Sequence, residues 1–523
     1  MNYVEGMGMT LKIRWVLAAL LLMAQGAWAQ TVEPSQTLTK IKKNSDCTVY
    51  TFNYPSVNVA GEPIVLSSAL FAWTPSKRQE TDSIESLHMF CHITITADYE
   101  RPSTNEGLSK EQSLLLFLPG RQYRNILTGK YANYAGRCIV IAPDYEGYGV
   151  TKDTPHPYLF QRATAQQMVD AVKYGLELYK KEAEKRDALL PLKSDWRSFC
   201  MGFSQGGAVS LATQRHIEEQ GLADELHFQG SICGDGPYDL TETLRYYIED
   251  DGKSYGVETS HRKDKVTMPL VVPLILKSMC ESHPEMKPYS IGSYLSQQLL
   301  DTGVLGWIDS KAYTTDEISK KWYNQLQTGV DTLDRHYTPE QMAELFENPN
   351  GSKVWGNVKK IFTPAVYEYL SDASHFDAVP EVAANAPQAL HRAFTDNSVI
   401  TGWEPKHRIQ FFHSKYDTVV PYSNYLSFRN AHPQGEGNLY RIDDTFSDSD
   451  HKNAGVSFMI NLLIAKSDPD VFNWLCEGIP TGIMDNNSEP TTNNHWHTLD
   501  GRRLSGKPTQ KGVYINYGRR IVR

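Results

Sequence analysis

The stretch Arg197–Gln220 reads RSFCMGFSQGGAVSLATQRHIEEQ, and its character changes at one serine. The apolar run before Ser204 predicts a buried strand, and the run after it predicts a helix. Gly202 and Gly206 give the spacing G-x-S-x-G, which is typical of a sharp strand-to-helix turn with the serine hydroxyl at its apex. Such a turn needs glycine at both flanks because larger side chains would clash there. The sequence therefore predicts that Ser204 is presented as a nucleophile.

Further apolar runs predict the strands that surround this turn. They read SLLLFLPG (113–120), RCIVIAPDYEGYG (137–149) and LHFQGSICGDG (226–236), and residues 161–185 have helical periodicity. Near-continuous apolar strands separated by amphipathic helices indicate a mostly parallel sheet with helices on both faces. The predicted fold class is α/β.

The part before residue 113 is rich in strand-like sequence. Its runs are CTVYTFNY (47–54), PIVLSSALFAW (63–73) and MFCHITITADY (89–99). Two interpretations remain open for residues 30–112: they supply the first strands of the sheet, or they form a small separate module.

The strand–helix alternation stops after Gly236 and returns near residue 396. Because a structureless loop of that length is implausible, residues 237–395 predict a large, mainly helical insertion that folds over the sheet as a lid. Within it, TMPLVVPLILKSMC (267–280) fits either an acyl-binding helix or the buried core of the insertion. Afterwards the sequence predicts strands at RIQFFHSKYDTVVP (408–421) and GNLYRI (437–442), and a closing helix at AGVSFMINLLIA (454–465).

An activated serine in this kind of fold needs an acid and a histidine, in the chain order Ser, acid, His. Asp417 follows the strand of RIQFFHSKYDTVVP and is the predicted acid, although aspartate is also a common turn residue. Asp443 and Asp444, after the next strand, are reserve candidates. His451, on the loop SDSDHKNAG before the closing helix, is the predicted base.

Three other histidines are alternatives to His451. His413 lies so close to the strand that it more readily packs or orients the Asp417 turn. His432 comes one element too early, and His156 precedes the serine, which breaks the order, although it could line the site.

The site also needs donors for an oxyanion. The predicted first donor is the backbone N–H of Gln205, the residue after the nucleophile. The predicted second donor comes from the loop after LLLFLP, at Gly120 or Arg121.

The composition limits the possible partners. The chain has 523 residues, is 40% hydrophobic and 22% charged, and carries a formal net charge of −9. A net negative charge argues against nucleic acid as the main partner, because phosphate binding needs a basic surface. Seven cysteines leave at least one thiol unpaired, and since none has C-x-x-C spacing we expect no metal or redox site.

The two ends of the chain carry segments that differ from the rest. Residues 1–29 have a basic start, the short apolar run Val16–Ala24 and an Ala27-Trp28-Ala29 cleavage site, which predict a signal peptide and export to the periplasm, cell surface or medium. Residues 479–494 read as a polar linker. Residues 495–523 contain two strand-like pieces and a basic end.

On Gly202–Gly207, the YDTVVP turn of Asp417 and the His451 loop, the chain resembles the α/β-hydrolase superfamily. APDYEGYG (142–149), followed by HPYL (156–159), resembles its secretory lipase and esterase branch, which carries a large lid. The resemblance implies one hydrolase domain over residues 30–478. It also implies that Ser204 attacks an ester carbonyl, His451 takes its proton and Asp417 holds the imidazolium, without a cofactor or metal.

The resemblance implies a small-molecule ester or a lipid or glycan ester as the substrate. Two alternatives remain: a serine peptidase of the prolyl or dipeptidyl type, which uses the same order, and a binding protein on an inactive hydrolase scaffold. The last residues, from His495, resemble the C-terminal sorting segment of exported Bacteroidota proteins and imply the secretion machinery as a partner. An ordinary terminal hairpin is the alternative there.

Overall fold

The structure is a computed structural model that describes residues 32–106, 115–122, 132–185, 189–349, 351, 353–376, 378–444, 449–464 and 471–477, and three short terminal strands. The chain divides into two units, Met1–Pro34 and Ser35–Arg523. The expected signal peptide and linker lie outside the described residues.

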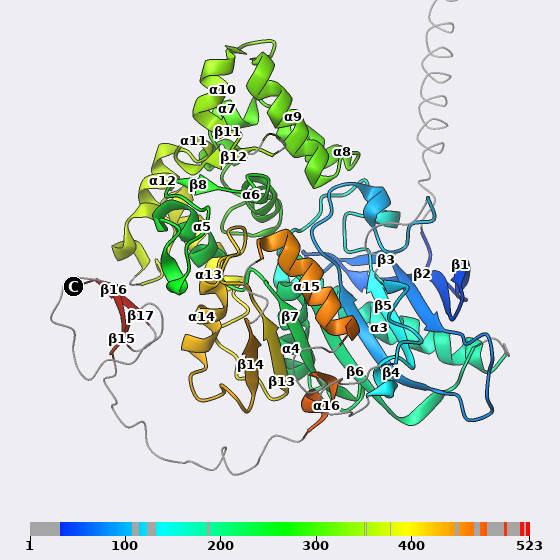
Figure 1. Ribbon diagram of the computed structural model, residues 1–523. Helices are drawn as coiled ribbons and strands as arrows, with labels where there is room; N and C mark the ends of the chain where they lie inside the picture. The colour runs from blue at the N-terminus through cyan, green and yellow to red at the C-terminus, as the bar shows by residue number, and fades with distance from the viewer. Residues whose placement is uncertain are drawn as a thin grey trace, which may run out of the picture. The chain divides into compact units, whose positions relative to one another are not determined.

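A nine-stranded sheet forms the centre of the second unit (Figure 1). Its strand order is β1-β2-β3-β5-β4-β6-β7-β13-β14. The strands from β5 to β14 run parallel, whereas β1, β2 and β3 pair antiparallel with their neighbours. The bounds are β1 (Thr39–Asn44), β2 (Cys47–Val57), β3 (Pro63–Trp73), β4 (Ile84–Cys91), β5 (Cys138–Pro143), β6 (Leu192–Phe203), β7 (Phe228–Gly234), β13 (Arg408–Phe412) and β14 (Tyr440–Asp443).

Helices cover both faces of this sheet (Figure 1). On one face α3 (Gln161–Ala183) and α4 (Gln205–Glu219) bury Met168, Val172 and Val209 against β2, β3 and β4. On the other face α15 (His451–Ile464) and α16 (Val471–Cys476) bury Phe458 and Phe472. Burial on both faces explains the continuous apolar runs of β5 and β13, and the predicted α/β architecture is confirmed.

The β-rich start of the chain belongs to this sheet and is not a separate module. β2 and β3 pair along eleven residues each, and β3 pairs with β5 through Ser68↔Pro143 to Ala72↔Ile139. β1, β2 and β3 therefore form one edge of the sheet, and the first of the two interpretations is correct.

The run SLLLFLPG was wrongly predicted as a strand. Leu115 to Gly120 form a helical turn followed by bends, and Leu115 and Leu118 are buried under one face of the sheet. The parallel strand is instead β4, IESLHMFC, which begins before the predicted Met89. Two polar residues concealed it, Ser86 and His88, whose side chains bond the carbonyls of Tyr134 (2.8 Å) and Ala135 (2.7 Å). A buried strand tolerates such residues when they find partners.

The segment between β7 and β13 is mainly helical. It contains α5 (Leu240–Glu249), α6 (Val271–Ser282), α7 (Gln297–Leu300), α8 (Val304–Ser310), α9 (Thr315–Thr328), α10 (Pro339–Leu345), α11 (Val358–Ile361), α12 (Pro364–Ser371), α13 (Ala386–Asp396) and the two- or three-residue strands β8 (Lys265–Val266), β9 (Val330–Asp331), β10 (His336–Tyr337), β11 (Phe346–Glu347) and β12 (Trp355–Asn357). Its core is continuous with α14 (Ser423–Ala431) and the β13 side of the sheet. Nine residues of α6 are buried, and six of these belong to that core, which favours the packing interpretation of TMPLVVPLILKSMC.

The seven cysteine thiols are free, and the sulfur atoms of Cys91 and Cys200 are 3.6 Å apart. Among the described residues, no helix has the length and apolar character needed to cross a membrane. Near the C-terminus, β15 (Trp496–Thr498), β16 (Val513–Asn516) and β17 (Arg519–Val522) pair antiparallel in a small sheet of their own.

Candidate active site

The turn at Ser204 has the strained geometry that its glycines predict. Ser204 has φ 58° and ψ −123°, in a region that non-glycine residues rarely occupy. A Cβ on Gly206 would lie 2.0 Å from the Cys91 carbonyl oxygen, and one on Gly202 would lie 2.5 Å from it. The two glycines therefore let the end of β4 approach the turn closely. The backbone N–H of Ser204 donates to Gly234 O at 2.8 Å, which ties the turn to β7.

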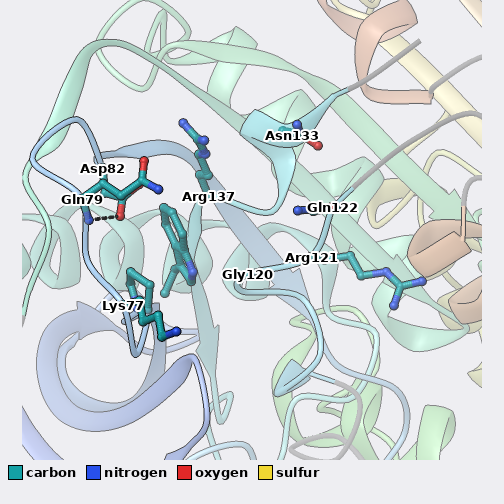
Figure 2. A pocket seen from close by; sticks show the side chains of 10 residues that line it. Lys77, Gln79, Asp82, Gly120, Arg121, Gln122, Asn133 and Arg137 are labelled. Carbon is teal, nitrogen blue, oxygen red and sulfur yellow. Dashed lines mark hydrogen bonds between the residues drawn. The ribbon is translucent and has the colours of Figure 1, made fainter. Parts of the chain in front are cut away.

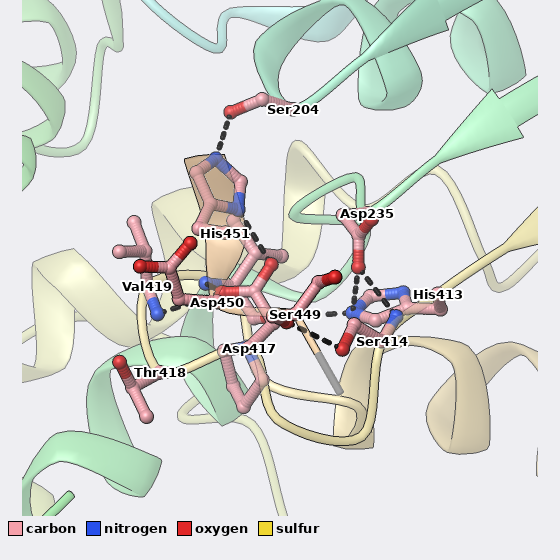
Figure 3. Close-up of polar contacts among 12 residues, drawn as sticks. Ser204, Asp235, His413, Ser414, Asp417, Thr418, Val419, Ser449, Asp450 and His451 are labelled. Carbon is pink, nitrogen blue, oxygen red and sulfur yellow. Dashed lines mark hydrogen bonds and ion pairs between the residues drawn. The ribbon is translucent and has the colours of Figure 1, made fainter. Parts of the chain in front are cut away.

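Ser204, His451 and Asp417 form one chain of hydrogen bonds (Figure 3). His451 Nε2 lies 2.9 Å from Ser204 Oγ, and His451 Nδ1 lies 2.5 Å from Asp417 Oδ2. The carboxylate must accept from Nδ1–H, so Nε2 is left with a lone pair for the serine proton. The structure brings together these three sequence-predicted residues from three separate segments of the chain.

Asp417 is fixed by its own turn. Its Oδ1 accepts the backbone N–H groups of Val419 and Val420, each at 2.8 Å, and the residue is 1% exposed. Both oxygens therefore have donors, which hold the carboxyl group in a fixed orientation.

The alternative histidines have other partners. His413 is fully buried, its Nε2 donates to Val420 O at 3.0 Å, and burial lowers its pKa to about 4, so it supports the Asp417 turn. His432 Nε2 bonds Ile400 O at 2.9 Å. His156 bonds Glu146 O through Nδ1 (2.7 Å) and receives the side-chain amide of Gln205 at Nε2 (3.1 Å). His156 is therefore next to the residue that follows the nucleophile.

Neither reserve acid takes the place of Asp417 as the partner of His451 Nδ1. Asp443 is the last residue of β14, and Asp444 accepts Lys415 Nζ at 2.7 Å and Tyr422 Oη at 3.3 Å.

Gly120 is not brought to Ser204, and its predicted role as an oxyanion donor is wrong. Its N–H donates at 2.7 Å to the carbonyl of Gly136, two residues before β5 begins. A Cβ at Gly120 would touch Trp73, the last residue of the antiparallel β3. Gly120 and Arg121 therefore lie at the amino ends of the parallel strands, in a pocket that also includes Lys77 (Figure 2), whereas Ser204 follows the carboxyl end of β6.

The loop that does reach the nucleophile follows β4. The Cβ position of Gly206 is 2.9 Å from the carbonyl of His92, so this loop lies against the start of α4. His92 is buried, stacks on Tyr145 at 3.9 Å and bonds the Asp144 carbonyl at 3.2 Å; burial lowers its pKa to about 4. His92 was predicted within the strand MFCHITITADY, because the alternating residues after Cys91 are also typical of a strand.

A second buried carboxyl group at the site, Asp235, was not predicted from the sequence. It follows β7 directly, at the same edge of the sheet as Ser204. Its position near the end of the predicted strand LHFQGSICGDG was the signal.

Asp235, His413 and Asp417 are the one group among the described residues with ligand atoms close enough to hold a metal ion. Several of their atoms are already engaged: Asp417 accepts three hydrogen bonds, and Asp235 Oδ1 accepts the Ser414 N–H at 2.7 Å. A metal there would compete with His451 for Asp417, so the donor set fits a hydrogen-bonded acid better than a metal centre.

No family model matches the chain, and no curated protein matches it in sequence. Among solved structures, the rice cell wall degrading esterase LipA of Xanthomonas oryzae matches with a TM-score of 0.55 and 18% identity, over 82% of this chain and 94% of LipA. A protein of Legionella pneumophila matches with a TM-score of 0.53 and 17% identity, over 81% of this chain and 89% of its own. With the strand order above, these likenesses establish the α/β-hydrolase fold.

Proposed function

We propose that this protein is a serine-dependent carboxylic ester hydrolase of the lipase and esterase type. The observation that carries the proposal is the hydrogen-bonded chain Ser204–His451–Asp417, with distances of 2.9 and 2.5 Å. A serine hydroxyl becomes a nucleophile when a base accepts its proton and an acid orients that base.

In the proposed mechanism, Ser204 Oγ attacks the ester carbonyl while His451 Nε2 takes the hydroxyl proton. The Asp417 carboxylate stabilises the resulting imidazolium. The tetrahedral intermediate collapses, the C–O bond to the alcohol breaks, and the alcohol leaves with the proton of His451. Water then attacks the acyl-enzyme with His451 as the base, and release of the acid regenerates Ser204.

The oxyanion requires donors aimed at the attacked carbonyl. The first is the backbone N–H of Gln205, at the start of α4. We place the second in the loop His92–Thr94, because the Gly206 contact shows that this loop reaches the start of α4. This replaces the earlier expectation of Gly120.

We further propose that the enzyme is exported and acts on an ester in a lipid or glycan. Residues 1–29 support a signal peptide, and residues 495–523 support recognition by a secretion machinery. The similarly folded Xanthomonas oryzae protein is described as cell wall degrading, which suits an extracellular ester. The segment 237–395 is proposed as a lid, since Tyr247 Oη donates to Val419 O and Thr267 Oγ1 donates to Thr418 O at 3.1 Å, next to Asp417.

The test is turnover of p-nitrophenyl esters of increasing chain length by the protein from Gln30, compared with Ser204→Ala. We expect turnover by the wild type and none above background by the variant. Ser210→Ala is the matched control, because Ser210 is a buried serine on the same helix, and it should retain activity. Labelling by a serine-reactive phosphonate without ester turnover would instead favour a peptidase. The absence of both labelling and turnover would favour a binding protein.

A further inference from the structure

Asp235 lies between the strands that carry the nucleophile and the acid. The carbonyl of Gly234 accepts Ser204 N–H, and the backbone N–H of Asp235 donates to Phe412 O at 2.8 Å. Asp235 is fully buried and adopts a positive φ of 34°. A buried acid at the end of β7 needs a reason, because burial of a carboxyl group is costly unless its oxygens are satisfied.

One oxygen of Asp235 holds the turn that leads to Asp417. Asp235 Oδ1 accepts the backbone N–H of Ser414 at 2.7 Å (Figure 3). Ser414 Oγ in turn donates to Ser449 O at 2.7 Å, two residues before His451. Through Ser414, the carboxyl group of Asp235 is connected to the segment that precedes Asp417 and to the segment that precedes His451.

The carboxyl group of Asp235 also lies close to that of Asp417. Asp235 Oδ2 accepts no hydrogen bond within the described part of the chain, and carboxyl oxygens of Asp235 and Asp417 lie within 4.8 Å of each other and of a His413 ring nitrogen. Among the described residues, no cation compensates there: His413 Nε2 is 3.6 Å from Asp235 Oδ1 but donates to Val420 O, and its depressed pKa keeps it neutral. The buried hydroxyl of Tyr238 interacts electrostatically with Asp235, and burial raises the pKa of Tyr238 well above its usual range, so it is uncharged.

Two adjacent buried carboxyl groups without a cation do not both ionise. Asp417 has three donors to stabilise its charge, whereas Asp235 has one. Burial, and then the charge of Asp417, raise the pKa of Asp235 well above its usual range. The proton therefore belongs on Asp235.

We propose that Asp235 is a positioning residue for the triad: its protonated carboxyl group donates a hydrogen bond to Asp417 while its second oxygen holds the Ser414 backbone. This rests on the proposed function, because it assigns a role at the same catalytic site. A protonated aspartic acid has one O–H donor and one carbonyl acceptor, and asparagine offers the same pair. Asparagine should therefore replace Asp235, whereas alanine should not.

The test compares Asp235→Asn, Asp235→Ala and the control Asp239→Ala in the full protein. Asp239 is the N-cap of α5 and accepts Glu242 N–H at 2.9 Å, so its loss weakens the same region without reaching the triad. We expect Asp235→Asn to keep kcat and the acid limb of the pH profile. We expect Asp235→Ala to lower kcat by about 10²-fold with little change in KM, because a small displacement of a catalytic group has that effect. Asp239→Ala should lower Tm and leave kcat unchanged.

Two results would overturn the proposal: full kcat in Asp235→Ala, or a loss in Asp235→Asn as large as in Asp235→Ala, which would mean that the ionised form is needed. If Asp235→Ala does not fold, the asparagine variant decides alone. The low-field proton resonance of His451 Nδ1–H needs no substrate and separates this proposal from the proposed function. It should persist in Asp235→Asn and shift in Asp235→Ala even if no ester is hydrolysed.

Discussion

The two ends of the parallel strands differ in how they use polar residues. At the carboxyl ends, Ser204, Asp417 and His451 come from three distant segments and converge on one buried chain of hydrogen bonds. At the amino ends, a pocket of about 210 Å³ has Gly120 and Arg137 on its walls. There Arg137 pairs with Glu85 at 2.8 Å and is 40% exposed. Exposed pairs of this kind contribute little, whereas buried chains orient their members.

Both ends carry a glycine turn next to an apolar run, so local sequence does not tell them apart. Gly206 lies against the backbone of Cys91, and Gly120 lies against the side chain of Trp73. The comparison predicts that equivalent changes at the two ends have unequal effects on activity.

The largest effect is expected at the carboxyl end, for His451→Ala. Removing the base of a serine triad lowers kcat by roughly 10⁴–10⁶-fold, because serine then keeps its proton. Steady-state kinetics with the best p-nitrophenyl ester provide the measurement, with His432→Ala as the control because the His432 ring bonds the Ile400 carbonyl and Glu404. Equal losses in the two variants would show that His451 has no special role.

The next largest effect is expected for Gly206→Ala. The added Cβ would lie 2.0 Å from the Cys91 carbonyl oxygen, a backbone atom that cannot rotate away. The turn must move, so we expect kcat to fall by about 10²-fold and stability to fall by about 1–3 kcal/mol. Kinetics and urea unfolding measure the two quantities, and wild-type kcat in this variant would contradict the close approach of β4.

Substitutions of two buried histidines, His88 and His156, should change the pH dependence of stability equally but change activity unequally. Burial lowers the pKa of His88 to about 4 and that of His156 to about 3. As the pH falls below 6.5, each of these histidines binds a proton in the unfolded chain but not in the folded protein. The free energy of unfolding therefore decreases from pH 6.5 down to the pKa of the histidine in the folded protein. His88→Gln and His156→Asn should each reduce the loss of stability between pH 7 and pH 5 by about 2 kcal/mol.

Urea unfolding at the two pH values measures this effect. The side chain of His156 contacts Gln205, so we expect a change in kcat for His156→Asn but not for His88→Gln. If stability depends on pH in both variants as it does in the wild type, these histidines bind protons in the folded protein as they do in the unfolded chain, and the prediction is wrong.

The smallest effect is expected for Gly120→Ala, at the amino end. Gly120 has φ +85° and its Cβ would lie 3.2 Å from Trp73, so we expect a stability loss of about 1 kcal/mol and an unchanged kcat. Thermal unfolding and ester turnover measure both. A loss of kcat as large as that of Gly206→Ala would show that Gly120 contributes to the active site after all.

Much of the candidate site was accessible from local sequence. The spacing of Gly202, Ser204 and Gly206 demands a turn that few other residues tolerate, and the chain order led to Asp417 and His451. Because most parallel strands are buried on both faces, they could be predicted from their apolar runs. The same rule failed at residues 113–120, because a short apolar run is also compatible with a buried non-strand segment.

The remaining features depend on contacts between residues far apart in the chain. Strand β4 inserts between β5 and β6 and thereby sends the His92 loop, rather than Gly120, to the nucleophile. Asp235 becomes adjacent to Asp417 because β7 and β13 are neighbours in the sheet. The spacing of glycines limits which backbone conformations a few neighbouring residues can adopt, so the serine turn can be predicted from the sequence. The direction of a strand and the groups that face a buried carboxyl group depend on long-range pairing, and these follow from the folded sheet.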